Sequence, residues 1–266
     1  VRVHIHTLDP GNVVHYVTSL GTIHGVNIRN MDEQHQDFLE MQRERAPATG
    51  LAIVAIVPGD RLSDVFSSLG VTAIVPGGQT MNPSTKDLLQ AAEQAASDKV
   101  IILPNNKNIV LTAGQVQSLT SKTIRVVPSK TIPQGVAALL AFDYEADFET
   151  NASIMTEALS TVKSIEITRA VRSTSLNGLA IKKKQAIGFL DGALIAVGDK
   201  TTDVVNDTLN RAGLEKAEVV TIYFGADASE AEAEEINNNI SSQYPELQVE
   251  VVNGGQPHYE YIISVE

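Results

Sequence analysis

The chain has 266 residues, 43% of them hydrophobic, no cysteine and a formal net charge of -12 at pH 7. This length and hydrophobic content suffice for two ordinary domains with their own cores, and they argue against a disordered chain. The negative charge argues against nucleic acid or an anionic membrane surface as the main partner. Because there is no cysteine, we expect no disulfide framework and no thiolate chemistry. Because there is no run of about 18 apolar residues, we expect no membrane span, and a cytoplasmic location is the default.

The first residues, VRVHIH, alternate in polarity and carry no initiator methionine. The alternation predicts a strand with His4 and His6 on one face, about 7 Å apart between their Cα atoms. Two imidazoles at this spacing can supply two ligands to a zinc ion, which needs a third and usually a fourth from elsewhere. A polar strand face with incidental histidines is the alternative. We expect the chain to be a piece cut from a longer protein.

A short helix is predicted after Asp9-Pro10-Gly11 and ends near Leu20, and a strand follows over residues 23–28. The charged run 37–45 is typical of a solvated helix or linker. Pro47 and Gly50 then mark a domain boundary. We therefore assign residues 1–46 to the end of one domain.

From residue 51 the sequence alternates regularly between apolar strands and helices. The expected strands are 51–57, 71–75, 100–103 and 124–127, and the expected helices are 60–69, 84–96, 112–119 and 133–142. Near-continuous apolar strands separated by helices predict an α/β subdomain, residues 47–146, whose parallel sheet is covered on both faces.

A proline directly follows each of these strands, and each loop that it opens is polar. Because the carboxyl ends of parallel strands share one edge, these loops are expected to form one surface for a partner or ligand. Its candidate contact residues are Gly77, Gly78, Gln79, Thr80, Asn82, Ser84, Asn105 and Asn106.

The paired glycines of this edge leave more than one interpretation open. A phosphate cradle at the start of the helix after residue 84 is one, but the chain has neither GxxxxGK[ST] nor GxGxxG. A contact loop and a purely structural turn are the others. Ser84 is expected to cap a helix rather than to act as a nucleophile, because no histidine lies nearby in sequence. Turn propensity is the simplest explanation of Asn105 and Asn106.

The remaining residues, 147–266, predict a mixed α+β subdomain. Its expected helices are 151–162, 201–212 and 229–243, and its expected strands are 163–171, 186–190, 193–197, 217–224, 247–252 and 259–265. Asp191-Gly192 predicts a tight hairpin, and Ser229 with Glu232 predicts a capping box. Glu166 is expected to be more exposed than Ile165 and Ile167, which point to the other face of its strand. Lys182, Lys183 and Lys184 are expected to protect an edge strand, with docking of an acidic partner as the alternative.

The acidic stretch 143–147 is expected at a helix end and linker rather than at a metal.

Several spaced motifs resemble one family when they are taken together: HIHTLDPG at 4–11, NMDEQH at 30–35, PGGQTMNPST at 76–85, LPNNKNI at 103–109 and GGQPHYEYIISVE at 254–266. This family is the large, ATP-using subunit of bacterial fatty acid kinase, the FakA group, with an amino-terminal domain like the DhaL subunit of dihydroxyacetone kinase. The similarity spans essentially the whole chain. The chain is similar to the end of the family's middle domain followed by a carboxyl-terminal, DegV-like region.

The resemblance implies a division of labour. In the family, the amino-terminal domain binds ATP and magnesium and phosphorylates a fatty acid carboxylate, which a separate DegV-like fatty-acid-binding subunit holds. This phosphorylation is a step toward phospholipid synthesis. Nothing in this chain matches that domain, so we expect the chain alone to be non-catalytic, to dock the lipid-carrying subunit and to form a homodimer.

The resemblance also bears on the metal and on lipid binding. It implies a zinc held by a cysteine and two histidines, with His4 and His6 matching the pair and the cysteine lying upstream of Val1. The alternative functions are that the DegV-like region itself binds a fatty acid or another small ligand, or that the chain is a regulatory fragment without a link to a kinase.

Overall fold

A computed structural model describes residues 11, 15–16, 18–19, 50–78, 81–176 and 178–266. The chain divides into two compact units, Val1–Arg45 and Ala46–Glu266. In the first unit, the described residues are helical, as the sequence predicts for this stretch. His4, His6 and the charged run 37–45 lie outside the described residues. No helix among the described residues has the length and apolar character needed to cross a membrane.

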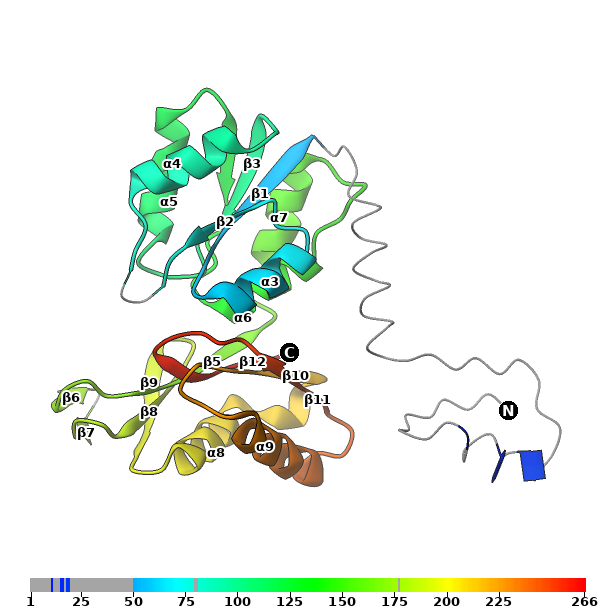
Figure 1. Cartoon of the computed structure of the whole chain (residues 1–266), viewed down its shortest axis with the longest axis vertical. Helices are drawn as coiled ribbons and strands as arrows, with labels where there is room; N and C mark the ends of the chain where they lie inside the picture. Colours follow the sequence, from blue (N-terminus) through cyan, green and yellow to red (C-terminus); the bar gives the residue numbers. More distant parts are fainter. Residues whose placement is uncertain (1–10, 12–14, 17, 20–49, 79–80, 177) are drawn as a thin grey trace. The chain divides into compact units, whose positions relative to one another are not determined.

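The first sheet of the second unit has four parallel strands in the order β2-β1-β3-β4 (Figure 1). They are β1 (Leu51–Val57), β2 (Ala73–Pro76), β3 (Lys99–Leu103) and β4 (Thr123–Val126). The predicted parallel sheet is therefore confirmed, and β1 has the predicted bounds. β2 begins two residues later than expected, because the Val71 N–H still donates to the Phe66 carbonyl in the turn after a helix and the regular pairing with β1 begins at Ala73.

Helices cover both faces of this sheet, as its near-continuous apolar strands predict. They are α3 (Asp60–Ser68), α4 (Thr85–Gln94), α5 (Val110–Val116), α6 (Ile132–Leu140) and α7 (Phe148–Ala158), with a short 3-10 helix, η1 (Gln117–Leu119), after α5. Alternate side chains of β1 point to opposite faces. Ile53 and Val57 pack with α3, α6 and α7, whereas Val54 and Ile56 pack with α4 and α5.

The second sheet has six strands in the order β11-β10-β12-β5-β8-β9. The strands are β5 (Lys163–Arg169), β8 (Ala186–Leu190), β9 (Ala193–Gly198), β10 (Val219–Phe224), β11 (Gln248–Asn253) and β12 (Tyr259–Val265). β10 and β11 are parallel, and the other neighbouring pairs are antiparallel. The predicted mixed α+β fold is confirmed, although α7, which the sequence assigns to this subdomain, packs on the first sheet.

One face of the second sheet is covered by α8 (Thr201–Ala212) and α9 (Glu230–Gln243), which contribute Val205, Leu209, Ile236 and Ile240 to its core (Figure 1). A short 3-10 helix, η2 (Leu214–Lys216), follows α8. Ser229 and Glu232 form the predicted capping box at the start of α9.

Two hairpins extend from the β5 side of this sheet. Asp191 and Gly192 have φ values of 49° and 80°, the left-handed conformation that a two-residue turn between β8 and β9 requires. A second hairpin, β6 (Thr174–Leu176) with β7 (Leu179–Ile181), forms its own small sheet and was not predicted, because strands of three residues show too little alternation. Lys182, Lys183 and Lys184 are exposed directly after β7.

The other face of the second sheet packs against the first subdomain. Tyr223 and Ile262 join the core that α3, α6 and α7 form with the first sheet. Thr131, at the start of α6, and Ser164, on β5, are buried and hydrogen bonded to each other at 2.7 Å. As predicted, Glu166 is more accessible than Ile165 and Ile167, which are fully buried, but its side chain is only partly accessible because the first subdomain covers its face of the strand.

Candidate functional site

The loops at the carboxyl ends of β1, β2 and β3 meet at one edge of the first sheet, where they face β5 and β12. They enclose a cavity of about 240 Å³, which we call the edge cavity. Its walls are Ile56, Pro58, Gly59, Pro76, Gly77, Gly78, Met81, Pro104, Asn105, Asn106, Ile132, Glu166, Pro257, His258, Tyr259 and Ile262. The sequence predicted the meeting of the strand-end loops, but not the contribution of β5 and β12.

Gly77 and Gly78 shape the floor of the edge cavity through close packing. A Cβ atom on Gly77 would lie 2.6 Å from Ile56 Cγ2 and 2.8 Å from Pro83 Cδ, so only glycine fits. The Gly77 N–H donates to the Val57 carbonyl, and the Gly78 N–H donates to the Met81 carbonyl. Because both N–H groups already have acceptors, the glycine pair does not offer free amides to an anion.

Asn105 is a buried structural residue of the cavity wall. Its φ is 52°, a left-handed conformation that asparagine tolerates better than most residues, and it is 7% exposed. Its Nδ2 donates to the Ile56 carbonyl at 3.0 Å, its Oδ1 accepts from Ser129 Oγ at 2.7 Å, and its N–H donates to the same Oγ. The turn that the sequence predicts here is thus locked by three hydrogen bonds.

The other predicted contact residues lie at different depths. Asn106 is 4% exposed, and its Oδ1 accepts from the Asn108 N–H. Asn82 is exposed beside Met81, which is 62% exposed. Ser84 is exposed and caps α4 by accepting from the Asp87 N–H, so its predicted capping role is confirmed. Gln79 and Thr80 lie outside the described residues, and the role of the whole set in partner contact stays a prediction.

Glu166 places a carboxyl group at the edge cavity. In the sheet its neighbours are Ile262 on β12 and Phe189 on β8, both apolar. Burial raises the pKa of the Glu166 carboxyl above its ordinary value, although a hydrogen bond from Tyr259 and the charge of Lys107 oppose that shift. A titratable group with a perturbed pKa in a cavity is a candidate functional residue.

Replacing Glu166 with glutamine is expected to flatten the pH dependence of stability. With a raised pKa, the folded protein holds the proton more tightly than the unfolded chain, so stability present at low pH is lost as pH rises through that pKa. The unfolding free energy of the variant, relative to the wild type, should therefore be higher at pH 8 than at pH 4. Urea unfolding at both pH values measures this difference. Glu215→Gln, on an exposed acid, is the control that should leave the profile unchanged.

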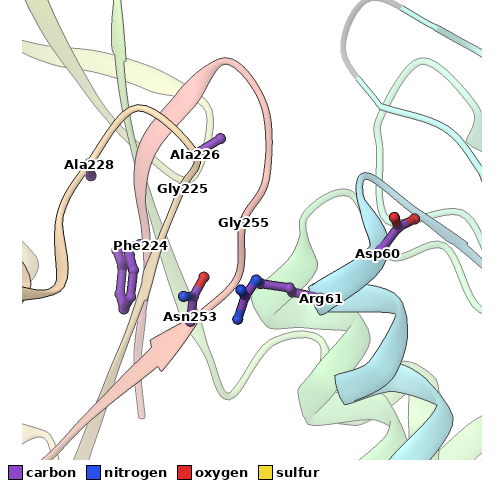
Figure 2. A pocket seen from close by; sticks show the side chains of 8 residues that line it. All are labelled: Asp60, Arg61, Phe224, Gly225, Ala226, Ala228, Asn253 and Gly255. Carbon is purple, nitrogen blue, oxygen red and sulfur yellow. The ribbon is translucent and has the colours of Figure 1, made fainter.

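A second hollow, of about 410 Å³, lies at the carboxyl ends of β10 and β11 (Figure 2). The Arg61 side chain extends from α3 toward Asn253 at the end of β11, and Asp60 lies beside Arg61 in the chain. Asp60 and Arg61 are both exposed and opposite in charge. This hollow therefore offers a solvated polar surface rather than a site selective for one charge.

The acidic stretch 143–147 has structural roles. Asp147 caps α7 by accepting from the Thr150 N–H, and hydrogen bonds from Thr150 lower the pKa of Asp147. Asp143 accepts from the Glu145 N–H. The predicted setting at a helix end is confirmed. No group of three or more histidine, aspartate or glutamate side chains that could hold a metal is found in the described part of the chain. The zinc prediction concerns His4 and His6, outside that part.

Comparison with known sequences gives two family matches that together span nearly the whole chain. Residues 52–266 match the carboxyl-terminal domain of the FakA-like fatty acid kinase family, and residues 1–38 match the middle domain of the same family. Protein YloV of Bacillus subtilis is 40% identical over 271 residues, covering 100% of this chain and 49% of YloV. An uncharacterized Staphylococcus aureus protein is 38% identical over 270 residues, with the same coverage. The chain thus spans about half the length of these relatives.

Comparison with solved structures gives the fold. A fatty-acid-binding DegV family protein from Thermus thermophilus superposes with a TM-score of 0.58 at 12% identity, covering 81% of this chain and 99% of that one. The Streptococcus pneumoniae fatty acid kinase B3 protein loaded with linoleic acid gives a TM-score of 0.53 at 12% identity, with the same coverage. The dihydroxyacetone kinase of C. freundii gives 0.56 at 13% identity, covering 83% of this chain and 48% of that one. Because it has a DegV-like fold and matches the middle and carboxyl-terminal domains of the family, the chain belongs to the FakA-like family of fatty acid kinase proteins.

Proposed function

We propose that this chain is the docking part of a fatty acid kinase large subunit. It engages a DegV-like fatty-acid-binding subunit, so that a kinase domain elsewhere in the whole protein can phosphorylate the acyl carboxylate with ATP and magnesium. Membership of the FakA-like family supports the kinase-related role, and the strand-end loops supply the exposed surface.

The observation that carries this proposal is the size of the edge cavity. Its volume of about 240 Å³ is below the roughly 300–1,000 Å³ of typical ligand pockets. At about 30 Å³ per non-hydrogen atom, which is roughly the volume of one water molecule, the cavity has room for about eight such atoms. This is well short of a long-chain fatty acid. The chain shares its fold with fatty-acid-binding proteins, but its cavity does not favour enclosing an acyl chain.

The charge of the cavity favours docking as well. A fatty acid carboxylate placed in the edge cavity would approach the carboxyl group of Glu166, and two carboxylates at one site repel each other. The rim, by contrast, offers a contact surface, because Met81 and Asn82 are exposed there beside Pro76. An exposed large apolar side chain among polar neighbours is typical of a protein-binding surface.

Replacing Gln79, Thr80 and Asn82 together with alanine is expected to weaken binding to the oleate-loaded fatty-acid-binding subunit by about tenfold. Substitutions in a loop usually cost little stability, so the unfolding free energy should change by less than about 0.5 kcal/mol. Isothermal titration calorimetry measures the affinity, and urea unfolding measures the stability.

The matched control replaces three exposed polar residues of α9, Asn238, Asn239 and Gln243, with alanine. It should bind like the wild type. Equal affinity of both triple variants would move the docking surface away from this loop. Stoichiometric oleate on the chain itself, detected by native mass spectrometry, would favour the alternative in which this region binds the fatty acid.

A further inference from the structure

The walls of the edge cavity combine apolar surface with one acidic side chain. Ile56, Pro58, Ile132 and Ile262 contribute apolar side chains, and Glu166 contributes a carboxyl group. Among the described lining residues there is no other aspartate or glutamate and no lysine or arginine. A ligand in this cavity therefore meets apolar walls, a few neutral polar side chains such as Asn106, His258 and Tyr259, and one carboxyl group.

The carboxyl group of Glu166 keeps acceptor capacity for a ligand. An ionised carboxylate has about four lone-pair sites, and the hydroxyl of Tyr259 fills one of them. Its two neighbours across the sheet, Ile262 and Phe189, have no side-chain donors. Lys107 attracts the carboxylate but does not line the cavity. Within the described part of the chain, no other side chain is seen donating to this carboxyl group, which leaves acceptor sites there for water or for a ligand that carries a hydrogen-bond donor.

We propose that the edge cavity binds a short, unbranched apolar stem ending in an ammonium group, with the ammonium donating to the Glu166 carboxylate. Room for about eight heavy atoms fits a stem of about five or six carbons and its nitrogen. An alkylammonium is charged at neutral pH, and pairing it with a carboxylate offsets the cost of burying both charges.

This proposal goes beyond docking to the lipid-carrying partner and does not depend on it. The alkylammonium group has two sources, a free small amine or the lysine side chain of a protein. Both present the same chemistry to Glu166. They differ at the other end of the stem, where a free amine has a methyl group and a lysine has the peptide backbone.

The test titrates the 15N-labelled 266-residue chain with n-hexylammonium and with hexanoate, two probes that share a stem and differ in charge. Saturable shifts of amide signals around Gly78, Asn106 and Glu166 are expected for n-hexylammonium, with a Kd of about 1 mM. Hexanoate should bind about tenfold more weakly or worse. Equal binding of the two probes, or no saturation by the amine, would overturn the proposal without any variant.

Variants then locate the charge that the amine recognises. Glu166→Gln should weaken n-hexylammonium binding by about tenfold, and the exposed-acid control Glu215→Gln should not change it. Unchanged binding to Glu166→Gln would contradict the proposed pairing. Titration with N-acetyl-lysine methylamide separates the sources. Binding comparable to that of n-hexylammonium assigns the site to a lysine side chain, and binding of n-hexylammonium alone assigns it to a free amine.

Discussion

Asn105→Ala is expected to lower the free energy of unfolding by about 3 kcal/mol. Alanine removes the side-chain hydrogen bonds to the Ile56 carbonyl and to Ser129 Oγ, leaving buried polar groups without partners. It must also adopt the left-handed φ of 52° that asparagine tolerates. Chemical denaturation measures the loss, and a value below about 1 kcal/mol would mean that this wall of the edge cavity rearranges without cost.

Two further substitutions separate these contributions. Asn105→Gly loses the same hydrogen bonds but adopts a positive φ freely, so it should be less destabilising than Asn105→Ala. Asn108→Ala removes an exposed amide from the same loop and should change stability by less than about 0.5 kcal/mol. If glycine costs more than alanine at position 105, strain is not part of the effect.

Gly225→Ala is expected to cost about 3 kcal/mol or more, or to prevent folding. A Cβ atom on this residue would lie 2.0 Å from the Tyr259 carbonyl oxygen and 2.7 Å from the Gln256 carbonyl oxygen. Both are backbone atoms, and Gly225 and Ala226 are hydrogen bonded to the segment that carries them. The clash therefore forces the end of β10 away from the start of β12.

Gly114→Ala is the matched control for this substitution. Gly114 lies inside α5, and a Cβ atom there would have no heavy atom within 4 Å. Alanine is the better helix former, so this variant should gain about 0.5–1 kcal/mol. Thermal unfolding of both variants measures the contrast. A stable, fully folded Gly225→Ala protein would show that β10 and β12 separate more easily than their hydrogen bonding indicates.

Most of the secondary structure was predictable because the local signals agree with the tertiary environment. Strands β1 and β12 and helix α8 have the bounds that their apolar periodicity predicts. The turn at Asp191-Gly192 and the cap at Ser229 follow from chemistry that acts over a few residues. The hairpin of β6 and β7 was missed, since its strands are shorter than the window in which alternation is visible.

The candidate site was predictable only in part, because it depends on which layers meet. That the strand-end loops share an edge follows from the parallel sheet. That the first subdomain partly covers Glu166 does not follow, because alternation separates the two faces of a strand without revealing what covers each face. Likewise, turn propensity accounts for the conformation of Asn105 but not for its burial. Nor does it account for the hydrogen bonds between Asn105 and Ser129, which is distant in sequence.

The position of β12 in the second sheet affects how the protein can fold during synthesis. β12 comes after the other strands of its sheet in the chain, yet it lies between β10 and β5 and is antiparallel to both. Until residues 259–265 have left the ribosome, β10 with β11 and β5 with β8 and β9 each present an unpaired edge in place of the missing central strand. Unpaired edges of this kind invite pairing with other chains. A nascent chain stalled before Tyr259 is therefore a natural substrate for chaperones and proteases.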